Sequence, residues 1–166
     1  MKIPISLTVN GRKRQALVEP RVSLADVLRE EWRLTATHLG CEQGVCGACT
    51  VLIDGAPARA CIALAASVDG SEIRTLEGFE QDPLMQRLKD AFHDQHGLQC
   101  GFCTPGMLIS AWDLLWRKGT CSAAEIRVAM SGNLCRCTGY QGIVRSIEAA
   151  AKGLDGQHRR VPSLDR

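Results

Sequence analysis

The chain carries the stretch Cys41-Glu42-Gln43-Gly44-Val45-Cys46-Gly47-Ala48-Cys49, and a further cysteine follows at position 61. The spacing of the first three cysteines, C-x4-C-x2-C, is that of plant-type [2Fe–2S] sites. A loop that brings four thiolates to one centre dictates how the sequence around it must fold. We therefore expect Cys41, Cys46, Cys49 and Cys61 to ligate one [2Fe–2S] cluster.

Three glycines lie in or beside this loop, at Gly40, Gly44 and Gly47. A loop that wraps around a cluster needs backbone conformations that reject a side chain, and glycine permits them. The amides of the loop are then free to point at the sulfurs, which is one way a protein sets the potential of a cluster. We expect these glycines to form the backbone of the first site.

A second group of cysteines lies in the other half of the chain, with the spacing C-x2-C-x31-C-x-C. Its members are Cys100, Cys103, Cys135 and Cys137. The helix pattern described below places each pair just before a helix. Helix N-termini favour negative charge, so this placement suits four thiolates and a second [2Fe–2S] cluster.

Different roles for the cysteines fit the pattern less well. Eight cysteines in two tight groups with flanking glycines are poorly accounted for as small buried hydrophobes. A four-cysteine zinc site stays open as an alternative, although C-x4-C-x2-C and a closing C-x-C are uncommon for zinc. Disulfides are the weakest option because no export signal is evident. Cys121 has no partner nearby in sequence and is expected to be a structural or surface thiol. His38, His93 and His96 lack the spacing of a Rieske site.

The first half of the chain is predicted to form a small mixed sheet with one helix. Apolar residues alternate over Ile3–Val9, as in a half-buried strand. Asn10-Gly11 favours a type I′ turn into a second strand through Gln15 and Leu17. The other predicted elements are strands at 50–53 and 72–76, and a helix capped by Ser23 with Leu24, Val27, Leu28 and Trp32 on one face.

After Leu76 the pattern becomes helical. Four helix starts are visible, at Asp82-Pro83, at Thr104-Pro105 with Thr104 as the N-cap, at the Ser122–Glu125 capping box and at Gly139. Four short helices with brief connections indicate a bundle. The sequence thus predicts an α+β chain in three parts: residues 1–76, residues 77–153 and a polar tail, 154–166.

Composition and charge exclude several classes of function. The formal net charge is +2 and the sequence contains no basic patch, so the chain lacks the positive charge that proteins use to bind nucleic acid. No segment is long and apolar enough to span a bilayer, and the first twenty residues do not have the order of a signal peptide. We expect a cytoplasmic protein without direct membrane insertion.

Three motifs together resemble the small iron–sulfur subunits of the molybdenum hydroxylases, the family of xanthine oxidase and carbon monoxide dehydrogenase. The resemblance covers residues 3–152 and rests on three segments in the right order: His38–Thr50, Gln99–Gly106 and Gly132–Tyr140. It implies a β-grasp ferredoxin domain followed by a four-helix [2Fe–2S] domain.

The resemblance also implies cofactors and partners. It implies a large molybdopterin-binding subunit, with cytosine dinucleotide as the form of the cofactor, and a medium FAD-binding subunit, in a dimer of heterotrimers. Gln99 matches the position that approaches the pterin. The cluster of the second cysteine group would lie on the molybdenum side, and that of the first group on the flavin side.

The function expected is electron transfer within a multi-subunit oxidoreductase, with no catalytic residue in this chain. Electrons would pass from molybdenum through the second and then the first cluster to FAD. A free-standing two-cluster ferredoxin is an alternative, but such carriers are usually strongly acidic and this chain is not. A zinc-stabilised binding module is the third hypothesis.

Overall fold

Alternating apolar residues build the first hairpin of the chain. Strand β1 (Ile3–Val9) buries Ile5, Leu7 and Val9 and pairs antiparallel with β2 (Arg12–Val18). Asn10 and Gly11 have φ angles of 51° and 75°, the two positive values that a type I′ turn requires. The predicted hairpin is confirmed.

Three more strands complete a five-stranded mixed sheet in the order β2-β1-β5-β3-β4. Strand β3 (Thr50–Ile53) turns at Asp54-Gly55 into β4 (Ala56–Arg59), and β5 (Glu72–Arg74) lies parallel to β1 and antiparallel to β3. Strand β5 is shorter than predicted because the amide of Thr75 donates to Asn10 Oδ1 (2.9 Å) and a 3-10 turn, η3 (Leu76–Phe79), begins at the next residue. A second 3-10 turn, η2 (Ala65–Val68), precedes β5.

The helix after Ser23 differs from the prediction. Ser23 caps it as expected, because its hydroxyl accepts from the amide of Asp26. Only α1 (Leu24–Asp26) is α-helical, however, and it continues as a short π-helix, η1 (Val27–Glu31). Glu31 lies seven residues after the buried Leu24, so in a regular α-helix the two side chains would lie on the same face. In the wider π-helical turn Glu31 is exposed instead.

Four α-helices follow, as predicted. They are α2 (Pro83–Asp94), α3 (Thr104–Lys118), α4 (Ala123–Ala129) and α5 (Gln141–Ala151), with a 3-10 turn η4 (Met130–Gly132) after α4. Asp82 caps α2, and Ser122 and Glu125 form the predicted capping box of α4. The prediction of Thr104 as the N-cap of α3 is wrong: the helix begins at Thr104 itself, and Cys103 stands at the N-cap.

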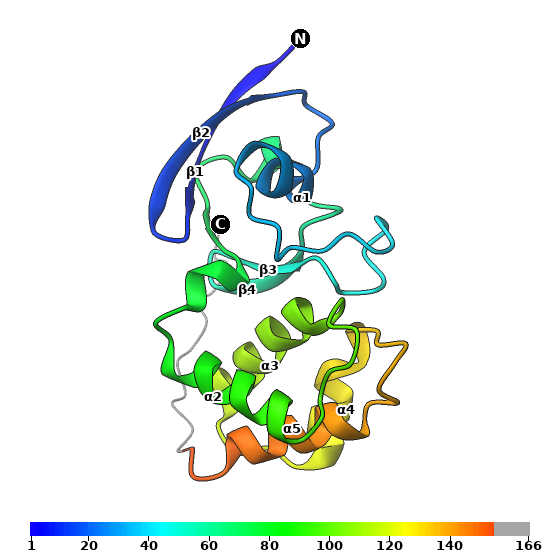
Figure 1. Cartoon of the computed structure of the whole chain (residues 1–166). Helices are drawn as coiled ribbons and strands as arrows, with labels where there is room; N and C mark the ends of the chain where they lie inside the picture. Colours follow the sequence, from blue (N-terminus) through cyan, green and yellow to red (C-terminus); the bar gives the residue numbers. More distant parts are fainter. Residues whose placement is uncertain (155–166) are drawn as a thin grey trace.

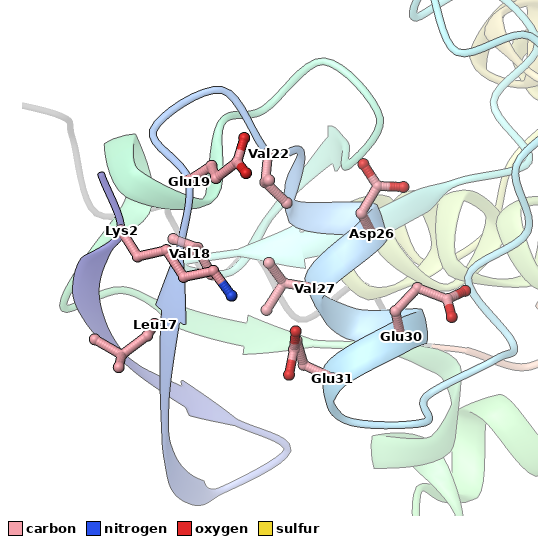
Figure 2. Close-up of a pocket in the computed structure, with 9 residues that line it drawn as sticks. All are labelled: Lys2, Leu17, Val18, Glu19, Val22, Asp26, Val27, Glu30 and Glu31. Atoms are coloured by element: carbon pink, nitrogen blue, oxygen red, sulfur yellow. The ribbon is translucent and has the colours of Figure 1, made fainter.

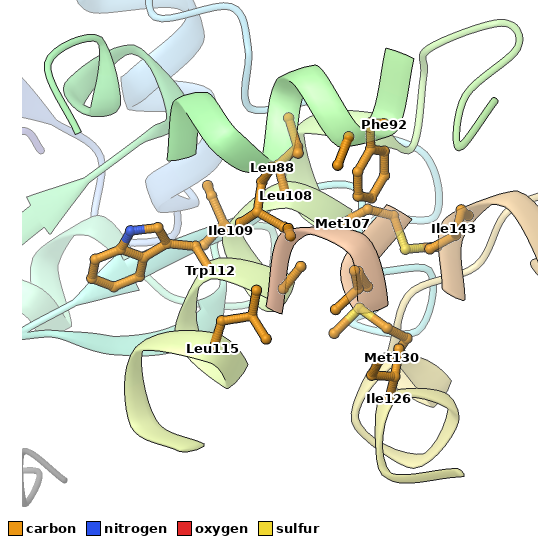
Figure 3. Packing of buried hydrophobic residues seen from close by; sticks show 14 of the residues in the cluster. Leu88, Phe92, Met107, Leu108, Ile109, Trp112, Leu115, Ile126, Met130 and Ile143 are labelled. Atoms are coloured by element: carbon orange, nitrogen blue, oxygen red, sulfur yellow. The ribbon is translucent and has the colours of Figure 1, made fainter. Parts of the chain in front are cut away.

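The computed structural model describes residues 1–154, and most of the predicted tail lies outside them. In Figure 1 the sheet and α1 lie together, and α3 runs beneath β3 and β4 with the other helices beyond it. One hydrophobic cluster lies between the sheet and α1, and the other lies among the helices. Figure 3 shows the second cluster, in which Phe92 of α2, Met107 of α3 and Ile143 of α5 meet. Among the described residues, none of the helices is long and apolar enough to cross a membrane.

Strand β3 contributes to both clusters. Successive side chains of a strand point to opposite faces, so Val51 packs into the cluster at the sheet and Leu52 into the cluster of the helices. Both residues are buried. The sheet and the helices therefore share one buried strand.

Candidate metal centres

The loop from Cys41 to Cys46 turns its amides toward the sulfur of Cys41. The amide of Cys46 donates to Cys41 Sγ at 3.3 Å. Hydrogen bonds from the amides of Cys46, Gln43 and Val45 lower the pKa of Cys41 to about 6. A sulfur surrounded by amide donors holds negative charge readily, as a thiolate ligand must.

The glycines of this loop serve two different purposes. Gly44 and Gly47 have φ angles of +79° and +76°, which side chains rarely adopt. Gly40 does not have a positive φ; it leaves room instead, since a Cβ there would lie 3.2 Å from Cys46 Sγ. The expectation of conformational freedom thus holds for Gly44 and Gly47, and close approach accounts for Gly40.

The other two cysteines of the first group form a more enclosed pair. Cys49 is buried at the start of β3, and the loop after β4 brings Cys61 back to it. Burial and a hydrogen bond with Cys49 raise the pKa of Cys61 to about 11. Cys41 also acts on Cys61 electrostatically, and the side chain of Cys46 forms a hydrogen bond with that of Cys41, so the four sulfurs lie close to one another.

The second group of cysteines gathers where α3 and α5 begin. Cys103 is the N-cap of α3, and Cys135 and Cys137 lie a few residues before α5. Cys100 and Cys137 approach to 3.5 Å between sulfurs and are exposed, whereas Cys103 and Cys135 are half-buried. Burial and a hydrogen bond with Cys135 raise the pKa of Cys103 to about 12. The group therefore has an outer pair and an inner pair.

Cys135 is held by several hydrogen bonds. Its amide donates to Tyr140 Oη at 2.8 Å, and the hydroxyl of Thr138 donates to its sulfur at 3.1 Å. Burial alone would raise the pKa of Cys135, but the hydrogen bonds from Thr138 and from the amide of Cys137 outweigh it, and the pKa is lowered. Like Cys41, this sulfur is prepared to carry negative charge.

The arrangement of the sulfurs suits a two-iron cluster. The sulfurs lie in pairs, and a [2Fe–2S] cluster with four cysteines takes two of them on each iron. The donor sets therefore fit this group.

One polar atom near the second group has an environment that the sequence does not predict, because the sequence marks Thr104 only as an N-cap. In the described part of the chain, Thr104 Oγ1 is the buried side-chain oxygen without a hydrogen-bond partner. It lies next to Cys103, at the start of α3. A hydroxyl donor in this position is suited to an acceptor that a cluster would supply.

Two other predicted residues lie at the surface of this region. Gln99 is exposed beside Cys100. His38 stacks on Phe102, with ring centroids 4.8 Å apart, and its Nδ1 lies 2.7 Å from the carbonyl oxygen of Phe102. His38 thus joins the two cysteine loops from the side, while His93 and His96 are exposed.

Further candidate features lie away from the sulfurs. A cavity of about 160 Å³ lies between β2 and the helical turns after Ser23 (Figure 2). Its lining includes Lys2, Leu17, Val27 and Glu31. Cys121 is buried among the helices, with its thiol 3.5 Å from the carbonyl oxygen of Gly119. This agrees with a structural thiol.

Comparisons with known proteins bear directly on these sites. Residues 21–98 match the family described as 2Fe-2S iron-sulfur cluster binding domain, and residues 75–148 match the [2Fe-2S] binding domain. Caffeine dehydrogenase subunit gamma of Pseudomonas sp. (strain CBB1) is 52% identical, over 89% of this chain and 90% of that protein. The xanthine dehydrogenase iron-sulfur-binding subunit of Escherichia coli O157:H7 is 42% identical, over 87% and 92%. The chain belongs to the iron–sulfur subunits of the molybdenum hydroxylases.

Solved structures of this family have the same fold. Quinoline 2-oxidoreductase from Pseudomonas putida 86 matches with a TM-score of 0.85 and 52% identity, over 90% of this chain and 94% of that chain. Aldehyde oxidoreductase from Desulfovibrio gigas matches with a TM-score of 0.80 and 40% identity, over 90% of this chain but 17% of that longer chain. As a member of the family, the chain is an electron-transfer subunit of an oxidoreductase rather than a free-standing ferredoxin.

Proposed function

We propose that the eight paired cysteines hold the two [2Fe–2S] clusters of this subunit. Cys41, Cys46, Cys49 and Cys61 would hold the first, and Cys100, Cys103, Cys135 and Cys137 the second. The observation that carries the proposal is the pairing of sulfurs in both groups, with Cys49 against Cys61 and Cys100 against Cys137. Each bound cluster would supply a one-electron carrier.

The exposure of the sulfurs supports a direction of electron transfer. The outer pair, Cys100 and Cys137, is exposed and lies beside Gln99, so this end is accessible to a partner subunit. Next to Cys135 of the inner pair, the amide of Leu134 donates to the carbonyl oxygen of Cys46 in the first loop. We infer that electrons enter at the outer pair from the molybdopterin side, where Gln99 would contact the cofactor, and leave from the first loop toward FAD.

The surface around the first loop is suited to a protein partner. Val45 and Ile62 expose 57% and 60% of their surface although both are apolar, and they lie beside Cys46 and Cys61. Exposed apolar side chains around a site commonly mark an interaction surface. We propose that this surface faces the FAD-binding subunit.

The finer assembly follows from the family. We propose a large molybdopterin-binding subunit carrying the cytosine dinucleotide form, a medium FAD-binding subunit and a dimer of heterotrimers in the cytoplasm. Within this chain we propose a β-grasp ferredoxin domain over 1–76 and a four-helix domain over 77–153, which the two hydrophobic clusters support. Each hydrophobic cluster lies largely within one of these two ranges.

A cysteine substitution tests the ligand assignment. Cys103→Ser in the holoenzyme should remove one of two [2Fe–2S] signals in electron paramagnetic resonance (EPR) and stall electron exit from molybdenum. Cys121→Ser is the matched control, because Cys121 is a buried thiol outside both groups, and it should keep both signals. Two intact signals and normal turnover in Cys103→Ser would overturn the assignment.

A further inference from the structure

Three residues of the loop before α5, Cys135, Thr138 and Tyr140, form a closed ring of hydrogen bonds. The amide of Cys135 donates to Tyr140 Oη at 2.8 Å, and the amide of Tyr140 donates to Thr138 Oγ1 at 3.2 Å. The hydroxyl of Thr138 in turn donates to Cys135 Sγ at 3.1 Å. The ring therefore starts and ends on the same cysteine, and its last bond acts on the sulfur.

The amide of Tyr140 fixes the direction of the Thr138 hydroxyl. A threonine hydroxyl has one proton to donate and two lone pairs that accept. Because the Tyr140 N–H is bonded to the acceptor side of this oxygen, the single proton of Thr138 is directed at Cys135 Sγ. Thr138 and Cys135 are both half-buried, and partial exclusion of water strengthens such a bond. The hydroxyl is therefore an oriented dipole with its positive end on the sulfur.

An uncommon backbone conformation makes the ring possible. Gly139 and Tyr140 have φ angles of 63° and 68°. A positive φ is common for glycine but rare for a residue with a bulky side chain, and it persists where the surroundings hold it. Tyr140 is the N-cap of α5, yet its side chain forms no capping hydrogen bond with that helix. Its hydroxyl serves the loop of Cys135 instead.

We propose that Thr138 is a positioning residue for electron transfer, and that its hydroxyl raises the reduction potential of the cluster held by the second cysteine group. The proposal rests on the proposed function, since it assumes that Cys135 ligates this cluster. Reduction by one electron from the molybdenum side places additional negative charge on the sulfurs. Thr138 keeps its proton, but its bond to the more negative sulfur becomes stronger. Hydrogen bonds to the sulfurs therefore favour the reduced form and help to set the potential.

Thr138→Val tests the role of the hydroxyl, because valine keeps the branched shape and removes the donor. Thr138→Ser is the matched control, since it keeps an O–H at the same position. A redox titration of the holoenzyme followed by EPR measures both clusters. In Thr138→Val the equilibrium constant for reducing the second cluster should fall roughly tenfold, or about 59 mV for a one-electron step. It should stay near the wild-type value in Thr138→Ser, and the first cluster is the internal reference. An unchanged potential in Thr138→Val would refute the proposal.

Tyr140→Phe separates this effect from a general loosening of the loop. It removes the oxygen that accepts from the amide of Cys135 but keeps the amide that orients Thr138. Thr138→Val and Tyr140→Phe should both lower the melting temperature, whereas only Thr138→Val should shift the potential. An equal shift in the two variants would make Thr138 merely structural. Thr138→Ala, which removes the same donor, takes the place of Thr138→Val should that variant not assemble.

The hydroxyl of Thr104 is the rival donor, because its oxygen is buried without a partner in the described part of the chain and lies next to Cys103. A lower potential in Thr104→Val, with none in Thr138→Val, would overturn the assignment to Thr138. A failure of the proposed function is distinguishable, because the wild-type holoenzyme would then lack one or both cluster signals.

Discussion

Replacing Gly47 with alanine should destabilise the protein through two separable effects. Gly47 has a φ of +76°, and an alanine in that conformation costs roughly 1–2 kcal/mol. The added Cβ would also lie 2.6 Å from the carbonyl oxygen of Gly132 and 2.7 Å from Asn133 Nδ2. Forcing extra atoms into a packed contact costs about 1–3 kcal/mol. The sum, roughly 2–5 kcal/mol, is a large part of the stability of a typical domain, about 5–15 kcal/mol.

The control for this variant is Gly11→Ala. Gly11 has nearly the same φ, +75°, but nothing lies within 4 Å of where its Cβ would be. Gly11→Ala should therefore lose only the conformational part, roughly 1–2 kcal/mol. Equilibrium unfolding of the full chain in urea measures both. An equal loss in the two variants would show that the contact between Gly47 and Gly132 is looser than described.

Two further variants address a helix cap and a surface residue. Hydrogen bonds from Ser122 and Lys118 lower the pKa of Glu125 from 4.5 to about 2, so its stabilising effect is present above its ordinary pKa and is lost as the pH falls toward about 2. Glu125→Gln should flatten the fall in urea midpoint between about pH 5 and about pH 3, and an unchanged pH profile would exclude this carboxylate as a contributor. Gln99→Ala should leave both EPR signals and the melting temperature unchanged because Gln99 is exposed, while substrate-driven cluster reduction in the holoenzyme slows. Unchanged reduction kinetics would remove Gln99 from the interface with the cofactor.

Local signals in the sequence predict most of the elements. The Asn10-Gly11 turn, the Asp82 cap and the capping box at Ser122 depend on residues close together in the chain, and the structure contains all of them. The short π-helix after Asp26 has no such signal, because the pattern of apolar residues there is compatible with an ordinary α-helix. The prediction places the N-cap of α3 one residue too late. Threonine is a common N-cap, so Thr104 is the expected residue, whereas Cys103 occupies the position.

Contacts between distant parts of the chain cannot be predicted in the same way. The cysteine spacing identifies each group, but it contains nothing about the hydrogen bond from Leu134 to Cys46. Asn133 likewise lies in a motif of the family without any local feature that marks it as buried. The sequence indicates that Gly47 is needed for its backbone conformation. Its close approach to Gly132, however, depends on how the sheet and the helices pack.

The position of β3 between the two hydrophobic clusters has a consequence for the evolution of these enzymes. Cutting the chain between the sheet and the helices would expose Leu52, which the helices bury. Gene fusion and fission should then act at the ends of this unit and spare its middle. The aldehyde oxidoreductase chain of Desulfovibrio gigas is longer, and the match covers 90% of this chain, sheet and helices together, and 17% of that chain. We therefore expect the sheet and the helices to stay together in longer relatives as well.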